Sequence, residues 1–216
     1  MAFRGWPAEA LEFFDGLAAD NSKTYWNAHK ATYDDCVRAP MVALLAELEP
    51  EFGPAKIYRP YRDVRFSKDK TPYKTQIAAS FERGGYVRLS ADGLGAGSGI
   101  YIFSPEQLRR YRDAVADDKS GPRLVQLIEE LQRKNVDISS HDVLKRVPPG
   151  FDKEHPRGEL LKHKGLYLGT QLEPAAWMGT KKAVDRVTKI WRDVQPVTKW
   201  FHRHVGPSDE PEAWGN

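Results

Sequence analysis

The sequence predicts an α+β fold: an antiparallel sheet with helices before and after it in the chain. Apolar residues recur at helical spacing before residue 53 and again after residue 105. Between residues 55 and 103 the pattern changes to short runs typical of strands. The connections between these runs are short and include Gly84-Gly85 and Asp92-Gly93, which favours antiparallel hairpins over parallel crossover units. We therefore expect a sheet of about four to six strands, formed mainly by residues 55–103.

Two helices are expected before the sheet. The first opens at Pro7, a residue suited to the first helical turn, and its apolar side continues to Leu17. Asp20, Asn21 and Ser22 break this pattern and offer an N-cap for the second helix, whose apolar side spans residues 26–48. Pro40 lies within that span and has no backbone N–H. We expect it to kink or interrupt the second helix.

The remaining elements follow from the same periodicities. The expected strands are residues 57–66, 76–82 and 86–91, with a fourth that ends at 100–103. Helical spacing resumes at residue 105 and near residue 124, and a last long helix carries an apolar stripe from 184 to 201 that Pro196 interrupts. Residues 147–156 are predicted to be irregular, and 166–168 to form a short strand.

Large apolar residues on these stripes are expected in the core, because each falls on the face that its element turns away from water. The residues we expect to be mostly buried are Trp26, Tyr33, Leu44, Phe66, Leu108 and Trp191.

The composition describes an ordinary folded protein. The 216 residues fit one domain, which we expect over residues 1–205, followed by a frayed tail at 206–216. The net charge of +3 is too small to demand a nucleic-acid partner. Cys36 is the only cysteine, which excludes an intramolecular disulfide. Neither a signal peptide nor an apolar run of membrane-spanning length is seen, so we expect a cytoplasmic protein with no membrane partner.

The segment from Arg59 to Lys74 concentrates charge. It contains six cations and two carboxylates within sixteen residues. If residues 57–66 form a strand, one face carries Arg59, Tyr61, Asp63 and Arg65. A turn at residues 67–71 then brings Lys70 back toward them. The cations and tyrosine proposed as ligand-binding residues are Arg59, Arg62, Arg65, Lys70, Tyr73, Lys74 and, from the second helix, Lys30.

Three functions are compatible with this cluster. In the first, guanidinium forks and lysines bind an anionic small molecule or a nucleic acid. In the second, the same pocket orients a phosphorylated or carboxylated substrate, and Asp63 is the general base of an enzyme. In the third, the charges form an internal ion-pair network, and the domain serves a structural or protein-interaction role. The sequence favours the first and leaves ligand, reaction and oligomeric state open.

Several other kinds of site find no support in the sequence. The six histidines lack the spacing of a metal site, and no Cys pair or His-Glu-x-x-His motif accompanies them. We therefore expect no metal and no cofactor. The nucleophile motif Gly-x-Ser-x-Gly is also missing. Glycines at 93, 95, 97 and 99 lack the Lys-Ser/Thr of a phosphate-binding loop, so we interpret them as a place where a helix packs closely, or as a flexible hairpin.

The charged segment also carries a resemblance. Its pattern Arg59-x-x-Arg62-Asp63-x-Arg65-Phe66-x-x-x-Lys70-x-Pro72-Tyr73 resembles the signature of a bacterial and fungal family catalogued as domain of unknown function 2461. Weaker similarities extend from about Pro7 to Phe201 and include Asn21–Trp26, where Tyr25-Trp26 replaces the family's usual Trp-Phe pair. The resemblance implies neither an activity nor catalytic residues.

Overall fold

The computed structural model describes residues 2–65, 67–82 and 84–208. Within it the chain forms two compact units, each completed by a segment from later in the sequence. They are Met1–Ala96 with Gln171–Lys189, and Gly97–Thr170 with Ile190–Asn216. The expectation of a single domain over residues 1–205 stays a prediction.

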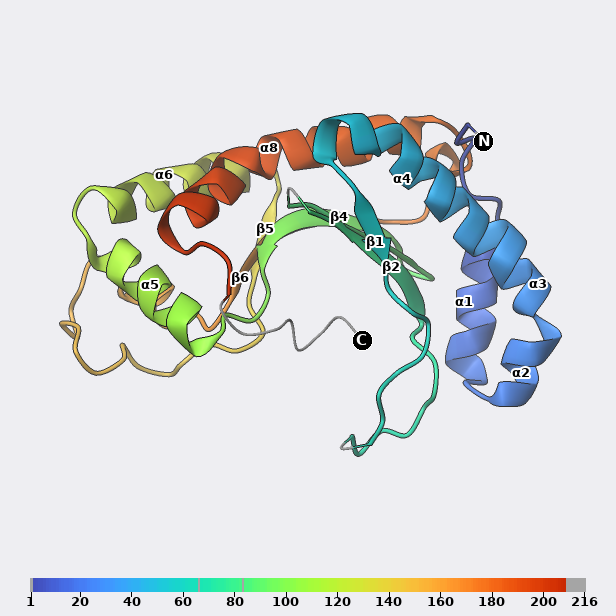
Figure 1. Cartoon of the computed structure of the whole chain (residues 1–216), viewed down its shortest axis with the longest axis horizontal. Coiled ribbons are helices and arrows are strands. Elements are labelled where there is room, and N and C mark those ends of the chain that lie inside the picture. The colour runs from blue at the N-terminus through green and yellow to red at the C-terminus, as the bar shows by residue number, and fades with distance from the viewer. Residues whose placement is uncertain (1, 66, 83, 209–216) are drawn as a thin grey trace. The chain divides into compact units, whose positions relative to one another are not determined.

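The first unit begins with a series of helices. They are α1 (Glu9–Ala19), α2 (Lys23–Ala28), α3 (Lys30–Thr32), the π-helical turn η1 (Tyr33–Arg38) and α4 (Ala39–Phe52) (Figure 1). Ser22 is the N-cap of α2, as predicted, and its hydroxyl accepts a hydrogen bond of 3.1 Å from the backbone N–H of Tyr25. The predicted interruption at Pro40 is also confirmed, because η1 ends two residues before it. Pro40 cannot donate to the carbonyl of Cys36, and the widened turn lies where that bond is missing.

The sheet has six strands in the order β1-β2-β3-β4-β6-β5. Their bounds are β1 (Ala55–Ile57), β2 (Gln76–Phe81), β3 (Tyr86–Ser90), β4 (Gly93–Ile100), β5 (Asp137–Ser139) and β6 (Leu166–Leu172). Antiparallel registers pair Lys56 with Ser80, Ala78 with Arg88, and Ile138 with Leu168. Four of the six strands fall within residues 55–103, so the predicted α+β class and antiparallel sheet are confirmed.

One predicted strand is wrong. Residues 57–66 were expected to be extended, but β1 ends at Ile57 and the chain then leaves the sheet until Gln76. Pro60 contributes to the early end, because it has no N–H to donate to a neighbouring strand. Phe66, whose burial was predicted, lies outside the described residues.

The burial expected from the apolar stripes is confirmed for four residues, all at most 5% exposed: Trp26, Tyr33, Leu44 and Trp191. Leu108 is only half-buried, at the edge of the second unit's core. In the first unit, the core lies between the helices and the sheet, where α1 packs against β3. Its fully buried side chains include Phe14, Leu17, Met41, Leu44, Ile77 and Leu89.

The alternating glycines occupy β4 and permit a close backbone approach, but the backbone that approaches belongs to a neighbouring strand rather than to the expected helix. A Cβ on Gly97 would come within 2.3 Å of the Leu168 carbonyl oxygen. A Cβ on Gly99 would come within 2.2 Å of the Leu166 oxygen, and its φ of 138° is one that other residues rarely adopt. The covering backbone belongs to the neighbouring strand β6, so these glycines serve the sheet.

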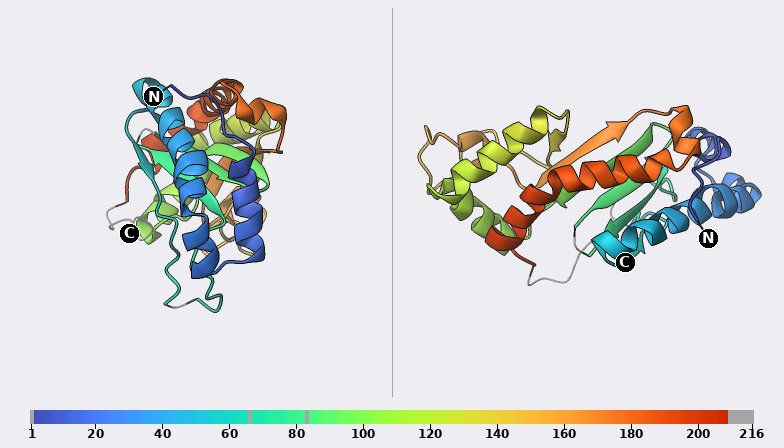
Figure 2. Two further views of the ribbon diagram at one scale, coloured as in Figure 1. Left: turned by 90° about the vertical axis from the view of Figure 1, so that its right-hand side faces the viewer. Right: turned by 90° about the horizontal axis from the view of Figure 1, so that it is seen from above.

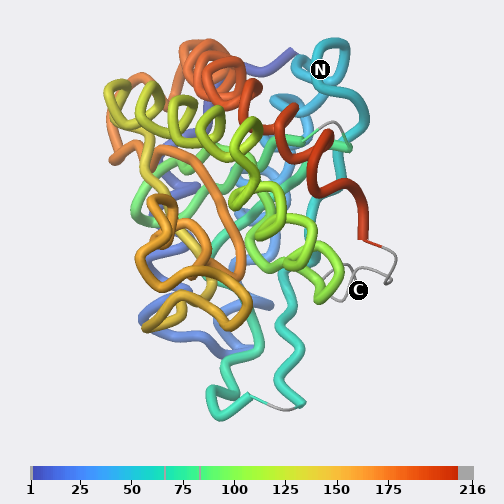
Figure 3. Tube along the Cα trace, turned by 90° about the vertical axis from the view of Figure 1, so that its left-hand side faces the viewer, coloured from blue at the N-terminus to red at the C-terminus, as the bar shows by residue number. Residues whose placement is uncertain are grey.

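The second unit packs α5 (Pro105–Ala116), α6 (Ser120–Gln132), the short α7 (Gly158–Leu161) and the end of α8 (Lys182–His204) around one apolar core. In Figure 3, α5 and α6 lie side by side with the C-terminal end of α8 next to them. The expected interruption at Pro196 does not end α8, which continues through the proline to His204. Residues 147–156 contain turns only, as predicted. None of the described helices is both long enough and apolar enough to cross a bilayer.

Arg157 connects two parts of this unit. Its side chain is 10% exposed and donates to the carbonyls of Val115 (2.6 Å) and Ala116 (2.7 Å) at the end of α5. A guanidinium there satisfies carbonyls that have no partner within the helix and complements the helix dipole. The tail expected at 206–216 begins in contact with the same helix, since Gln107 Nε2 donates to Gly206 O at 3.0 Å. Residues 209–216 lie outside the described part.

Candidate functional site

The charged segment forms a long loop between β1 and β2. We call residues 58–75 the basic loop; all of them except Phe66 are described. The loop extends beyond the ends of these two strands (Figure 1 and Figure 2). Its two arms pair at the base, where Tyr61 and Tyr73 form an isolated antiparallel bridge. Two backbone hydrogen bonds of 2.8 Å flank this bridge, from Arg62 N to Pro72 O and from Lys74 N to Pro60 O.

An aromatic stack attaches the base of the loop to α2. The rings of Trp26 and Tyr73 are parallel within 6°, with centroids 4.4 Å apart. Tyr61 lies next to both, at 6.0 Å from Trp26 and 5.5 Å from Tyr73. Asn21, just before α2, binds the backbone of Tyr73 on both sides: Tyr73 N donates to Oδ1 (3.0 Å), and Nδ2 donates to Tyr73 O (3.1 Å). The amide of Asn21 thereby satisfies the backbone N–H and C=O of Tyr73, which the bridge with Tyr61 leaves unpaired.

Arg65 is occupied by Asp63. Its Nη2 lies 2.7 Å from Oδ2 of the carboxylate, and its Nε donates to Oδ1 at 3.0 Å. The backbone N–H of Arg65 adds a bond of 3.2 Å to Oδ1. These bonds lower the pKa of Asp63 to about 2. The carboxylate is therefore ionised at neutral pH but is a very weak base.

Arg62 and Lys70 are also engaged within the loop. Arg62 Nη1 forms an ion pair with Asp69 and donates to the Thr71 hydroxyl. The bonds from Arg62 and Thr71 lower the pKa of Asp69 to about 2. Lys70 Nζ donates to the carbonyl of Val64 at 2.9 Å. The expected return of Lys70 toward the preceding arm is thus present, and it serves to close the tip of the loop.

Arg59 and Lys74 differ from Arg62, Arg65 and Lys70. Among the described residues, neither forms an ion pair or a side-chain hydrogen bond. Lys74 is half-buried, and its ammonium lies 5.7 Å from the centre of the Tyr58 ring. Burial, and secondly the positive charge of Arg59, lower the pKa of Lys74. The two cations are therefore close enough to repel each other at the base of the loop.

Lys30 does not extend this pair. It lies on the short helix α3 and forms an exposed ion pair with Asp34, one turn further along the chain. Of the predicted site residues, the structure thus brings Asp63 together with Arg65, Arg59 near Lys74, and Tyr73 onto the aromatic stack. Sequence reasoning missed Asn21 and Tyr61. The only signal for either was its place in the family-like segments, because both act through contacts distant in sequence.

The described part of the chain shows neither a metal site nor a reactive cysteine. No group of three or more His, Cys, Asp or Glu side chains is placed to hold a metal ion there. Cys36 is half-buried, and burial raises the pKa of its thiol, which makes it a poor nucleophile.

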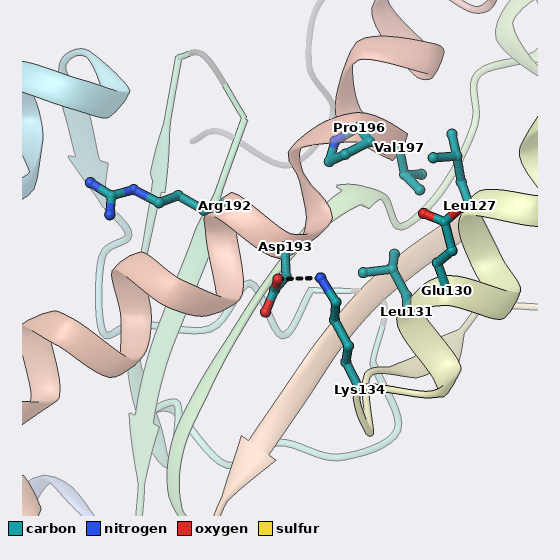
Figure 4. Close-up of a pocket in the computed structure, with 8 residues that line it drawn as sticks. All are labelled: Leu127, Glu130, Leu131, Lys134, Arg192, Asp193, Pro196 and Val197. Atoms are coloured by element: carbon teal, nitrogen blue, oxygen red, sulfur yellow. Dashed lines mark hydrogen bonds and ion pairs between the residues drawn. The ribbon is translucent and has the colours of Figure 1, made fainter.

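A small hollow in the second unit lies between α6 and α8 (Figure 4). Its volume of about 100 Å³ is well below that of a typical ligand pocket. Lys134 forms an ion pair with Asp193 at 2.6 Å across it, between apolar side chains. This arrangement describes a helix contact, and we do not consider the hollow a functional site.

Comparison with known proteins adds one finding. Residues 9–200 match a family described as Conserved hypothetical protein (DUF2461). The match includes both units and the whole basic loop. A search of curated proteins finds no match.

Proposed function

We propose that this chain, which belongs to the DUF2461 family, binds a phosphate- or carboxylate-bearing ligand at the base of its basic loop, through Arg59 and Lys74. One observation carries the proposal. Two like charges are held near each other at this position, and no described carboxylate pairs with either of them.

Such an arrangement costs free energy in the unoccupied protein, because burial and the nearby charge of Arg59 both disfavour the charged form of Lys74. An anion between them removes that cost and gains charge-assisted hydrogen bonds. Arg59 offers a planar fork that matches two oxygens of a phosphate or carboxylate, and Lys74 adds a point charge. The partial burial of Lys74 strengthens its attraction for an anion, since screening by water is weaker there.

The remaining loop residues act as its framework. The pairs Asp63–Arg65 and Asp69–Arg62 use both carboxylates of the loop, and Lys70 closes its tip. These contacts support the internal ion-pair interpretation for this half of the cluster. They also argue against Asp63 as a general base. Arg65 occupies both of its oxygens, and a carboxylate with a pKa of about 2 takes up a proton weakly at neutral pH.

The test is calorimetric titration with inorganic phosphate, pyrophosphate and citrate at low ionic strength. The double variant Arg59→Ala with Lys74→Met should weaken binding at least about 100-fold, because it removes two charged hydrogen-bond donors. Lys68→Met is the control, since Lys68 is exposed in the same loop and its loss removes one of the loop's other positive charges. Its affinity should stay within about twofold.

Circular dichroism verifies that each variant is folded. The proposal is refuted if none of the three anions binds the wild type, or if the double variant binds as tightly as the Lys68→Met protein.

A further inference from the structure

Tyr61 is the outer member of the aromatic stack at the base of the loop. The inner members, Trp26 and Tyr73, are each 4% exposed, whereas Tyr61 is 49% exposed. Its ring is tilted against both of them, by 52° and 46°. The outermost ring of the stack, that of Tyr61, therefore packs against Trp26 and Tyr73 on one side and is about half exposed to solvent.

This ring belongs to the same short stretch of chain as the two cations. Arg59 precedes Tyr61 by two residues, which is roughly 7 Å along an extended chain. Lys74 follows Tyr73, the bridge partner of Tyr61, and its N–H donates to Pro60 O at 2.8 Å. The bridge and the contact with Asn21 fix the backbone of this stretch, which carries both the exposed ring of Tyr61 and the two cations.

We propose that the ligand is a nucleoside phosphate, whose base stacks on Tyr61 while its phosphate binds Arg59 and Lys74. This inference rests on the proposed function and names the class of anion. Every nucleobase has a face that stacks on an aromatic ring, and its phosphate matches a guanidinium fork. An anion without a ring would use the cations alone and leave the supported face of Tyr61 without a partner. The same chemistry occurs in a free mononucleotide and in a single-stranded nucleic acid.

Two titrations separate the base from the phosphate. AMP and ribose 5-phosphate share the sugar phosphate, and only AMP carries a base. The wild type should bind AMP more tightly, by about 5- to 150-fold, which is the usual effect of one stacked base. Tyr61→Leu keeps apolar cover over Tyr73 but removes the ring, and should reduce the ratio of the two affinities to about one. Tyr61→Phe should keep the ratio.

The outcomes distinguish base stacking on Tyr61 from anion binding by Arg59 and Lys74. Equal binding of AMP and ribose 5-phosphate by the wild type, or an unchanged ratio in Tyr61→Leu, overturns the stacking and leaves the phosphate site intact. If neither compound nor inorganic pyrophosphate binds, the anion site itself is wrong. Saturation transfer from the protein to the protons of the adenine ring gives a second measurement on the wild type and Tyr61→Phe. If Tyr61→Leu fails to fold, this measurement shows whether the adenine ring contacts the protein.

A third ligand identifies the source of the nucleotide. Oligo(dT) of about ten nucleotides is compared with thymidine monophosphate, because a single strand continues along the charged loop. Tighter binding of the oligonucleotide with a steep salt dependence supports a nucleic acid. Equal binding per site supports a free nucleotide.

Discussion

Replacing Trp26 by alanine tests the account of how the basic loop is attached. Trp26 is 4% exposed and contacts four aromatic rings: Tyr73 is parallel to it at 4.4 Å, and Tyr61 lies at 6.0 Å. Tyr33 lies at 4.8 Å and Phe13 at 5.9 Å. Truncating a buried tryptophan to alanine costs about 3–5 kcal/mol in the free energy of unfolding. Roughly 1 kcal/mol of this reflects the lost contact with Tyr73.

The free energy is measured by urea denaturation followed by circular dichroism, with Tyr101→Ala as the control. Tyr101 is 56% exposed, so its truncation should change stability by no more than about 0.5 kcal/mol. Trypsin gives a second measurement, because loss of the stack should loosen the loop that carries the exposed residues Lys68 and Lys70 and speed cleavage there. A loss of less than about 1 kcal/mol for Trp26→Ala, with unchanged cleavage, would refute the anchoring role.

Two further predictions concern single charges. Arg157→Met should lower the free energy of unfolding by about 2–4 kcal/mol, because the carbonyls that end α5 lose charged donors. The control is Arg133→Met, which removes an exposed i,i+4 partner of Glu129 and should lower the free energy of unfolding by less than about 0.5 kcal/mol. Equal urea midpoints for the two variants would contradict the capping role of Arg157. Lys74→Met should stabilise the ligand-free protein at neutral pH, since the folded state lowers the pKa of Lys74 below 10.5 and so disfavours its charge. The gain in stability should shrink as the pH rises through the lowered pKa toward 10.5, because Lys74 in the unfolded chain also loses its proton there. Thermal melts of the wild type and Lys74→Met at several pH values measure this gain. A gain that stays constant or grows with pH would contradict the prediction.

Local patterns in the sequence determined most of the elements of the fold. The N-cap at Ser22, the strands after Gln76 and the break before Pro40 each depend on residues within about one helical turn or one hairpin. The predicted strand over residues 57–66 failed because alternation describes a possible face, whereas a strand also needs a neighbour. Pro60 has no N–H for such a neighbour, and the described loop pairs only at one bridge.

The charged cluster shows the same division. Its composition alone identified the segment from Arg59 to Lys74 as exceptional, and its family resemblance could be read from the letters. The sequence could not show which cations are paired, because Asp63 and Asp69 can each reach several of them along a flexible chain. The folded loop gives Arg65 and Arg62 to these carboxylates and leaves Arg59 beside Lys74. Distances across the loop decide that choice, and sequence spacing does not contain them.

The contacts that hold the loop in place depend still more on tertiary structure. Asn21 and Tyr73 are separated by 52 residues, yet the side-chain amide of one completes the backbone hydrogen bonds of the other. The helical stripe predicted that Trp26 lies in the core. It did not predict that Tyr73 stacks on Trp26, because a contact between distant segments leaves no periodic pattern in the sequence. What the sequence determined by itself is the identity and local form of each segment. The meeting of α2 with the base of the loop is decided by the tertiary fold, because buried surface and hydrogen bonds between distant residues exist only once the chain is packed.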